Sequence, residues 1–167
     1  TAVYREFENE IEKEKAEKIL ARRGMRAVLD RENGVFLNIL FPDRDIPGLS
    51  TNDGSIVAKL VYGDTSFLLT GDSPKAVESY LVSLDGEKLR SDILKVGHHG
   101  SKTSTGEVLL GYVSPEYAVI SSGKNNKYGH PHKETTNSLQ KFNIPYFNTA
   151  TDGTVVFQSD GVSVVKK

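Results

Sequence analysis

Hydrophobic and polar positions follow two different periods along this chain, and the change of period predicts the order of its elements. In the first 20 residues the apolar side chains of Val3, Phe7 and Ile11 recur at roughly helical spacing among Glu and Lys. Ile19 and Leu20 extend the same pattern. This spacing predicts a surface helix, because one apolar stripe is left among charged neighbours. After it, runs rich in β-branched and aromatic residues alternate with turn residues, which predicts strands.

The predicted strands of the first half form two hairpins, which turn at Asn33-Gly34 and at Gly63-Asp64. Asn-Gly and Gly-Asp pairs favour tight turns because glycine and asparagine tolerate a positive φ. The four strands are expected over residues 26–30, 35–41, 55–62 and 65–70. Between the hairpins, residues 43–54 are rich in Asp, Pro, Gly, Ser and Asn without any period, which predicts an exposed loop.

The second half alternates between helical and strand patterns. Helices are predicted over residues 74–84, 107–112 and 132–142. Strands are predicted over residues 93–96 and 117–121, and shorter β segments over 146–147, 155–158 and 162–165. Strands followed by helix–strand units indicate a layered α/β arrangement. We expect residues 1–167 to form one domain.

Composition narrows the chemistry that this domain can carry. The chain has 167 residues, no Cys and a formal net charge of -1. Without Cys, any metal site must be built from His, Asp and Glu. A near-neutral charge argues against a generally basic nucleic-acid-binding surface, although a local positive patch remains compatible with it. The longest apolar runs are far too short to span a membrane.

The four His residues lie between positions 98 and 132, in two pairs, and each pair lies in a loop that follows a predicted strand. Asp72 has the equivalent position after the strand predicted over 65–70. In layered α/β folds, loops at the carboxyl ends of strands line the ligand crevice. We therefore expect three strand ends to converge on one site.

Asp72 is the candidate carboxylate of this site. It follows an apolar strand and a glycine, and a hard anionic oxygen in that place can bridge two cations. The alternative is a helix cap, because Asp72-Ser73-Pro74 is also typical of a helix N-terminus.

The adjacent His98 and His99 lie between two glycines, which allow the backbone to turn both imidazoles towards one centre. One of them is expected to bind metal, and the other to bind metal or contact the substrate. The alternative is a pair of solvated loop histidines. Ser101 and Lys102 follow directly and are candidate donors to a substrate phosphate.

His130 and His132 are separated by Pro131, and an extended backbone would place both imidazoles on the same side. The segment also opens a predicted helix, whose N-terminus attracts anions, so it is suited to a phosphate or to a metal-bound oxyanion. The alternative is a helix cap in which the histidines are incidental. Lys124 and Lys127 in the same loop add local positive charge, unless they are simply solvated surface lysines.

Three ordered motifs carry a family resemblance: FLLTGD at 67–72, DILKVGHHGS at 92–101 and GKNNKYGHPH at 123–132. Together they resemble the metallo-β-lactamase-like domain of the competence protein family that forms the bacterial DNA-uptake channel. The resemblance implies an αββα sandwich. It also implies a site for two divalent metal ions, zinc or manganese, that activates water against a phosphodiester.

The resemblance also implies roles for individual residues. Asp72 matches the bridging aspartate, and His98 and His99 match the late histidine motif that supplies metal ligands. His130 and His132 match the G-H-P-H segment, which we interpret as catalytic, binding the substrate phosphate or protonating the leaving group.

The H-x-H-x-D-H motif of that superfamily does not occur, since no His precedes position 98. The chain is therefore expected to be the C-terminal portion of an αββα domain that lacks this half. On its own it is expected to bind metal weakly and to be inactive. Its sheet face is expected to lack the partner that the missing N-terminal half would supply.

The leading functional hypothesis is a metal-dependent phosphodiesterase or nuclease that acts on DNA during uptake. It would work at the extracytoplasmic face of the membrane, joined to the channel portion of a larger protein. One alternative is a hydrolase for a small phosphoester of the phosphocholine type. Another is a structural or binding module without metal.

Overall fold

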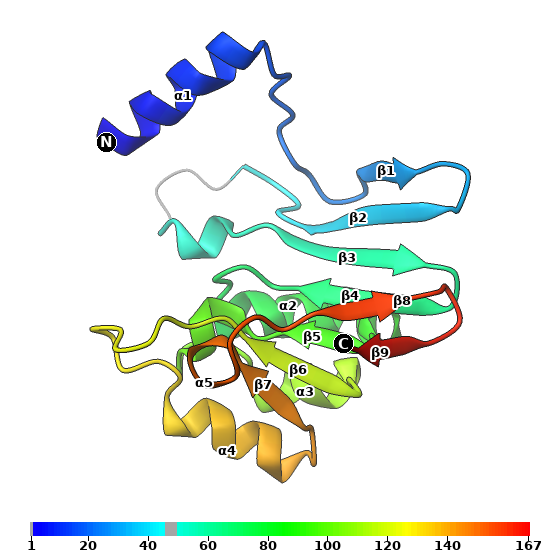
Figure 1. The fold of residues 1–167 in the computed structure, drawn as a ribbon, viewed down its shortest axis with the longest axis vertical. Coiled ribbons are helices and arrows are strands. Elements are labelled where there is room, and N and C mark those ends of the chain that lie inside the picture. The colour runs from blue at the N-terminus through cyan, green and yellow to red at the C-terminus, as the bar shows by residue number, and fades with distance from the viewer. Residues whose placement is uncertain (1, 46–49) are drawn as a thin grey trace.

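The computed structural model describes residues 2–45 and 50–167 and shows a mixed α/β fold built on one seven-stranded sheet (Figure 1). In spatial order the strands are β1 (Arg26–Asp30), β2 (Val35–Phe41), β3 (Val57–Tyr62), β4 (Thr65–Leu69), β5 (Ile93–Lys95), β6 (Tyr117–Ile120) and β7 (Tyr146–Asn148). Neighbours from β1 to β4 are antiparallel, and those from β4 to β7 are parallel. The predicted strand order along the chain is confirmed, and four parallel strands therefore end at the same edge.

Both predicted hairpins are present, β1–β2 and β3–β4. Gly34 and Gly63 have φ values of 68° and 55°, which L side chains rarely adopt. A Cβ atom at Gly63 would also collide with the carbonyl group of Gly161. The predicted loop 43–54 contains the short turn η1 (Asn52–Gly54), while its residues 46–49 lie outside the described part.

The helices that follow the hairpins cover one face of the sheet. They are α2 (Lys75–Asp85), α3 (Glu107–Val113) and α4 (Lys133–Lys141), with the short turns η2 (Gly86–Leu89) and η3 (Gly97–Gly100). The core between helices and strands contains Leu68, Leu94 and Ile120 from the sheet, with Leu81 and Leu110 from the helices. Every one of these five side chains is almost fully buried, which is the main source of stability in a domain of this size.

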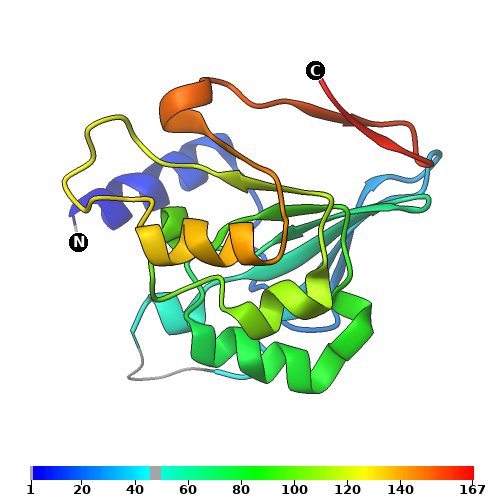
Figure 2. The same cartoon turned by 90° about the horizontal axis from the view of Figure 1, so that it is seen from below.

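The opposite face of the sheet is covered only in part. The hairpin of β8 (Phe157–Ser159) and β9 (Val164–Lys166) lies on it (Figure 2). Its Phe157 ring is 5.6 Å from the ring of Tyr117 and 6.1 Å from that of Phe147. Leu69 on the same face remains 36% exposed. Both strands of this hairpin begin two residues later than predicted, because the pairing register, not the hydrophobic run, fixes where they pair.

The first helix, α1 (Ala2–Glu14), stands clear of the sheet and has no buried residue (Figure 1). It is shorter than the 20-residue helix predicted from the apolar spacing. The helix stops where Lys15 takes a φ of 53°, and Ile19 and Leu20 continue as exposed irregular chain. A further short helix, α5 (Thr149–Asp152), was not predicted, since four residues are too few to show a period.

Candidate active site

Asp72 and three of the four histidines meet at the carboxyl edge of the parallel strands. Asp72 follows β4, His98 and His99 follow β5, and His130 lies between β6 and α4. The ring centres are 6.3 Å apart for His98 and His99, 5.7 Å for His98 and His130, and 6.4 Å for His99 and His130. The predicted convergence of three strand ends is therefore what the structure has, because parallel neighbours end on the same side.

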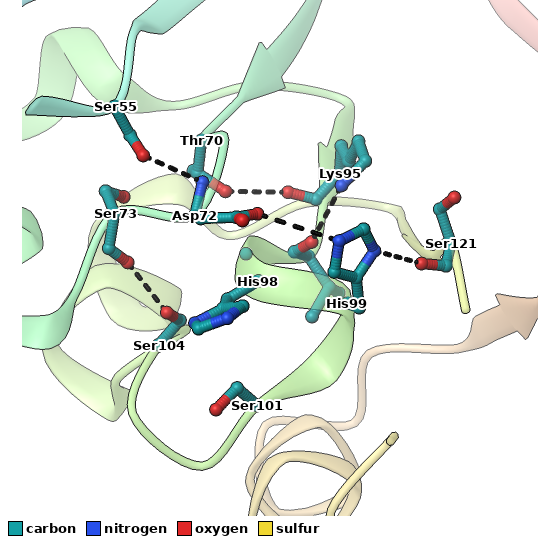
Figure 3. Close-up of polar contacts among 12 residues, drawn as sticks. Ser55, Thr70, Asp72, Ser73, Lys95, His98, His99, Ser101, Ser104 and Ser121 are labelled. Atoms are coloured by element: carbon teal, nitrogen blue, oxygen red, sulfur yellow. Dashed lines mark hydrogen bonds and ion pairs between the residues drawn. The ribbon is translucent and has the colours of Figure 1, made fainter. Parts of the chain in front are cut away.

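Asp72 is not a helix cap. The residue at the cap position of α2 is Pro74, whose side chain makes no capping hydrogen bond. Instead, Oδ1 of Asp72 is 3.9 Å from Nε2 of His99 (Figure 3), and its backbone N–H donates to Oγ of Ser55. Gly71 makes this turn with a φ of 56°. The carboxylate is left accessible at the strand end, where the functional interpretation needs it.

The turn that carries His98 and His99 has unusual backbone geometry. Their φ values are 47° and 56°, and that of Gly100 is 84°, so three consecutive residues are left-handed. Such conformations cost free energy in non-glycine residues and cluster at functional sites. The turn is fastened by the backbone N–H of His98, which donates to the carbonyl of Gly71 at 3.0 Å. It aims both imidazoles at the Asp72 side of the edge, as Figure 3 shows.

The hydrogen bond of His99 fixes its tautomer. Its Nδ1 lies 2.7 Å from the carbonyl oxygen of Ser121, which can only accept, so Nδ1 carries the hydrogen. In the neutral ring Nε2 then keeps a free lone pair, and this atom is the one that faces Asp72. A carbonyl group behind a histidine is the arrangement that orients imidazole metal ligands.

His132 has the opposite tautomer to that of His99. The backbone N–H of Lys102 donates to its Nδ1 at 3.1 Å, so the hydrogen of the neutral ring is on Nε2. The ring centre of His132 is 4.8 Å from that of His130. Burial lowers the pKa of His130, and the positive charges that His132, His98 and His99 can carry lower it further. His130 is therefore neutral at pH 7, while His132 presents an N–H donor.

Lys95 is a site residue that the sequence analysis missed. It lies at the end of β5, and Figure 3 shows it beside His99 and Asp72. Its Nζ donates to the carbonyl of Val96 at 3.3 Å. Burial lowers the pKa of Lys95, and the Asp72 carboxylate partly offsets this. The signal for it was a lone cation inside an otherwise apolar strand.

The three predicted phosphate donors lie in different surroundings. Ser101 is buried, and its hydroxyl is 2.9 Å from that of Thr103. Lys102 and Lys124 are exposed, and within residues 2–45 and 50–167 their ammonium groups have no hydrogen-bond or ion-pair partner. The two lysines are thus available to an anion, whereas the hydroxyl of Ser101 faces the protein. Their substrate-binding roles stay predictions.

Glu78 is a further residue near the site and, unlike Lys95, it has no sequence signal, because it is one polar position among several in α2. It is 1% exposed, and its carboxylate accepts the backbone N–H groups of Thr105 at 2.6 Å and Gly106 at 2.8 Å. Burial raises its pKa to about 7, against the opposing effect of these two bonds and of Lys75. Oγ1 of Thr105 accepts in turn from the backbone N–H of Gly97 at 2.9 Å. Glu78 therefore anchors the loop next to the His98–His99 turn.

The predicted two-metal centre is not formed by these residues alone. In the described part of the chain, no group of three or more His, Cys, Asp or Glu side chains could hold a metal ion. Imidazole nitrogen and carboxylate oxygen are suitable ligands for zinc or manganese, but a stable site needs at least three of them pointing at one position. The geometry supplies a pair, His99 and Asp72, with His98 and His130 nearby.

The chain is similar in sequence to segments of several bacterial competence proteins. It is 39% identical over 121 residues to ComE operon protein 3 of Bacillus subtilis, 38% over 125 residues to competence protein ComA of Neisseria gonorrhoeae, and 38% over 122 residues to recombination protein 2 of Haemophilus influenzae. These matches cover 72%, 75% and 73% of this chain. The chain is homologous to a segment of bacterial competence proteins. No protein-family model matches it.

The homologous segment is a small part of these competence proteins. It spans 15% of the Bacillus subtilis protein, 18% of the Neisseria gonorrhoeae protein and 15% of the Haemophilus influenzae protein. The resemblance inferred from the three motifs is thereby confirmed at the level of competence proteins. Within the residues that the structure covers, no helix has the length and apolar character of a membrane span.

Proposed function

We propose that this chain is part of a metal-dependent phosphodiesterase that cleaves DNA during competence-related uptake. One observation carries the proposal: Asp72, His98, His99 and His130 meet at one sheet edge in a chain homologous to competence proteins. Adjacent imidazoles and a carboxylate at the carboxyl ends of parallel strands are suited to hydrolytic chemistry. In this proposal the chain is one segment of a larger membrane protein. That protein also has a channel portion, and this segment lies at the extracytoplasmic face.

The different tautomers of His132 and His99 support different roles for the two residues. His132 presents Nε2–H and can donate to a phosphate oxygen or protonate a leaving group. His99 presents a free Nε2 towards Asp72 and is suited to bind a cation. The exposed Lys102 and Lys124 add positive charge for a phosphate backbone.

We propose two divalent ions, zinc or manganese, for the complete site. Asp72, His98 and His99 would supply part of the ligand set, and residues outside this chain would supply the rest. The same outside residues would form the second sheet of an αββα sandwich. The half-covered sheet face around Leu69 has the exposed apolar surface that such a sheet would cover.

Replacing Asp72 with Asn is the direct test. In the complete product of the gene that encodes this chain, we expect Asp72→Asn to lower manganese-dependent hydrolysis of a single-stranded oligonucleotide by about 100-fold, because the amide replaces the carboxylate that lies beside His99. Elemental analysis is expected to find less bound metal in the variant. The chain alone is expected to bind metal weakly and to hydrolyse little.

Lys141→Ala is the matched control, since this exposed lysine pairs with Glu107 on the helical side, away from the edge. It should leave hydrolysis and metal content unchanged. If the complete product holds no metal and Asp72→Asn has no effect, the chain is a binding module. Turnover of a small phosphoester that single-stranded DNA does not inhibit would instead favour the phosphocholine-type hydrolase.

A further inference from the structure

Three rings lie nearly parallel in a row beside the candidate active site. The planes of Tyr128 and His130 differ by 22°, with ring centres 5.7 Å apart. Those of His130 and His99 differ by 21°, with centres 6.4 Å apart. The row leads from the Asp72 side of the site to the surface, where Tyr128 is 65% exposed.

The middle of this row is held in place by its own loop. The amide side chain of Asn126 accepts from the backbone N–H of His130 at 2.9 Å and donates to its carbonyl at 2.7 Å. His99 is fixed by its bond to Ser121. The backbone of His130 and the ring of His99 are therefore held in place before any ligand arrives, which lowers the entropy cost of binding beside them.

A hollow of about 190 Å³ opens beside the rings. Its walls include all three rings, together with Ser122 and Asn126. An exposed aromatic ring at the mouth of a hollow lined by other rings is suited to a flat, unsaturated group. Nucleobases are such groups, and every base has a π face that can stack on tyrosine without sequence preference.

Two lysines belong to the same loop as Tyr128. Nζ of Lys127 is 5.1 Å from the centre of the Tyr128 ring. Lys124 is exposed in the same loop. A base that stacks on this face of Tyr128 would displace the ammonium of Lys127, which can then pair with the adjoining phosphate. Only a single strand offers its base faces, because in a duplex they are covered by neighbouring pairs.

We propose that Tyr128, with the His130 and His99 rings behind it, is a stacking platform for a base of single-stranded DNA, and that Lys127 binds the neighbouring phosphate. This deepens the proposed function and rests on it, since it names the strand form and the contact that guides it to the site. Tyr128 thereby becomes a specificity-determining residue, not a catalytic one.

The test compares two strands that differ only in their bases. Binding of the chain to a dye-labelled oligonucleotide of about 12 nucleotides, and to an abasic strand of equal length, is measured by fluorescence anisotropy in a chelator, so that no hydrolysis occurs. We expect Tyr128→Ala to weaken binding of the base-bearing strand about tenfold and to leave the abasic strand unaffected. Tyr128→Phe should restore binding, because the ring is kept.

Two further variants separate stacking from charge. Lys127→Gln is expected to weaken the binding of both strands and to make that binding less dependent on salt concentration. Tyr112→Ala is the matched control, since Tyr112 is a partly exposed tyrosine on α3, and it should leave both strands unaffected.

Several results would overturn the platform. Binding by Tyr128→Ala could be unchanged, or Tyr128→Ala could weaken the binding of both strands equally. The wild-type chain could bind neither strand, or phosphocholine could displace the bound strand. Hydrolysis by the complete gene product distinguishes the two proposals. If the complete gene product cleaves DNA but any of these binding results is found, the proposed phosphodiesterase function is supported and only the stacking platform is rejected.

Discussion

We expect the stability advantage of the wild-type chain over Glu78→Gln to be about 2.5 kcal/mol larger at about pH 5 than at about pH 8. The cause is the buried carboxyl group of Glu78, whose pKa is raised to about 7 in the folded chain. Glutamine keeps the shape of the side chain but does not titrate, so the difference between the two proteins isolates this group.

The sign follows from proton binding. Burial is the main cause of the raised pKa, and the N–H groups of Gly106 and Thr105, with the cation of Lys75, oppose it. Between the ordinary pKa of 4.5 and about 7, the folded chain binds more protons at Glu78 than the unfolded chain does. The free energy of unfolding therefore falls as pH rises through this window, and Glu78 adds no further change above it.

Denaturant unfolding of both proteins across this pH range measures the effect. The lowered pKa of His130 gives a pH dependence of the opposite sign, but His130 is present in both proteins, so its contribution cancels in the difference. A difference between wild type and Glu78→Gln that stays constant with pH would show that Glu78 is ionised or exposed throughout.

Replacing Gly100 with Ala is expected to lower the free energy of unfolding by about 3 kcal/mol, from overpacking added to a strained backbone. A Cβ at this position would lie 2.6 Å from Cβ and 3.1 Å from Cα of Pro131, and the φ of 84° is unfavourable for alanine. The carbonyl of Gly100 also accepts from the backbone N–H of His132 at 2.9 Å. The substitution therefore separates the two histidine loops where they touch.

Gly129→Ala is the matched control in the same region. Gly129 also has a positive φ, 72°, but a Cβ there would meet nothing within 4 Å. We expect it to cost only about 1 kcal/mol, which is the backbone part of the effect. Unfolding curves measure both losses, and the imidazole signals of His98 and His132 in NMR spectra should shift in Gly100→Ala alone. Equal losses in the two variants would mean that the Pro131 contact carries no weight.

Much of this fold was predictable from the sequence. Turn pairs such as Asn33-Gly34 mark the hairpins because few residues accept a positive φ, and these signals are local. Four histidines and Asp72 after successive strands predict a shared edge, because parallel strands end together. The homology to competence proteins was visible in the same motifs.

Other features depend on contacts between segments far apart in the chain, and only the tertiary structure decided them. Packing of α2 against the loop at Thr105 buries Glu78, although its position in the sequence resembles any exposed helix residue. The carbonyl of Ser121 sets the tautomer of His99 across 22 residues. The burial of Ser101, which the sequence suggested as a phosphate donor, has the same origin. Periodicity encodes which elements form, whereas side-chain environment arises only when those elements pack together.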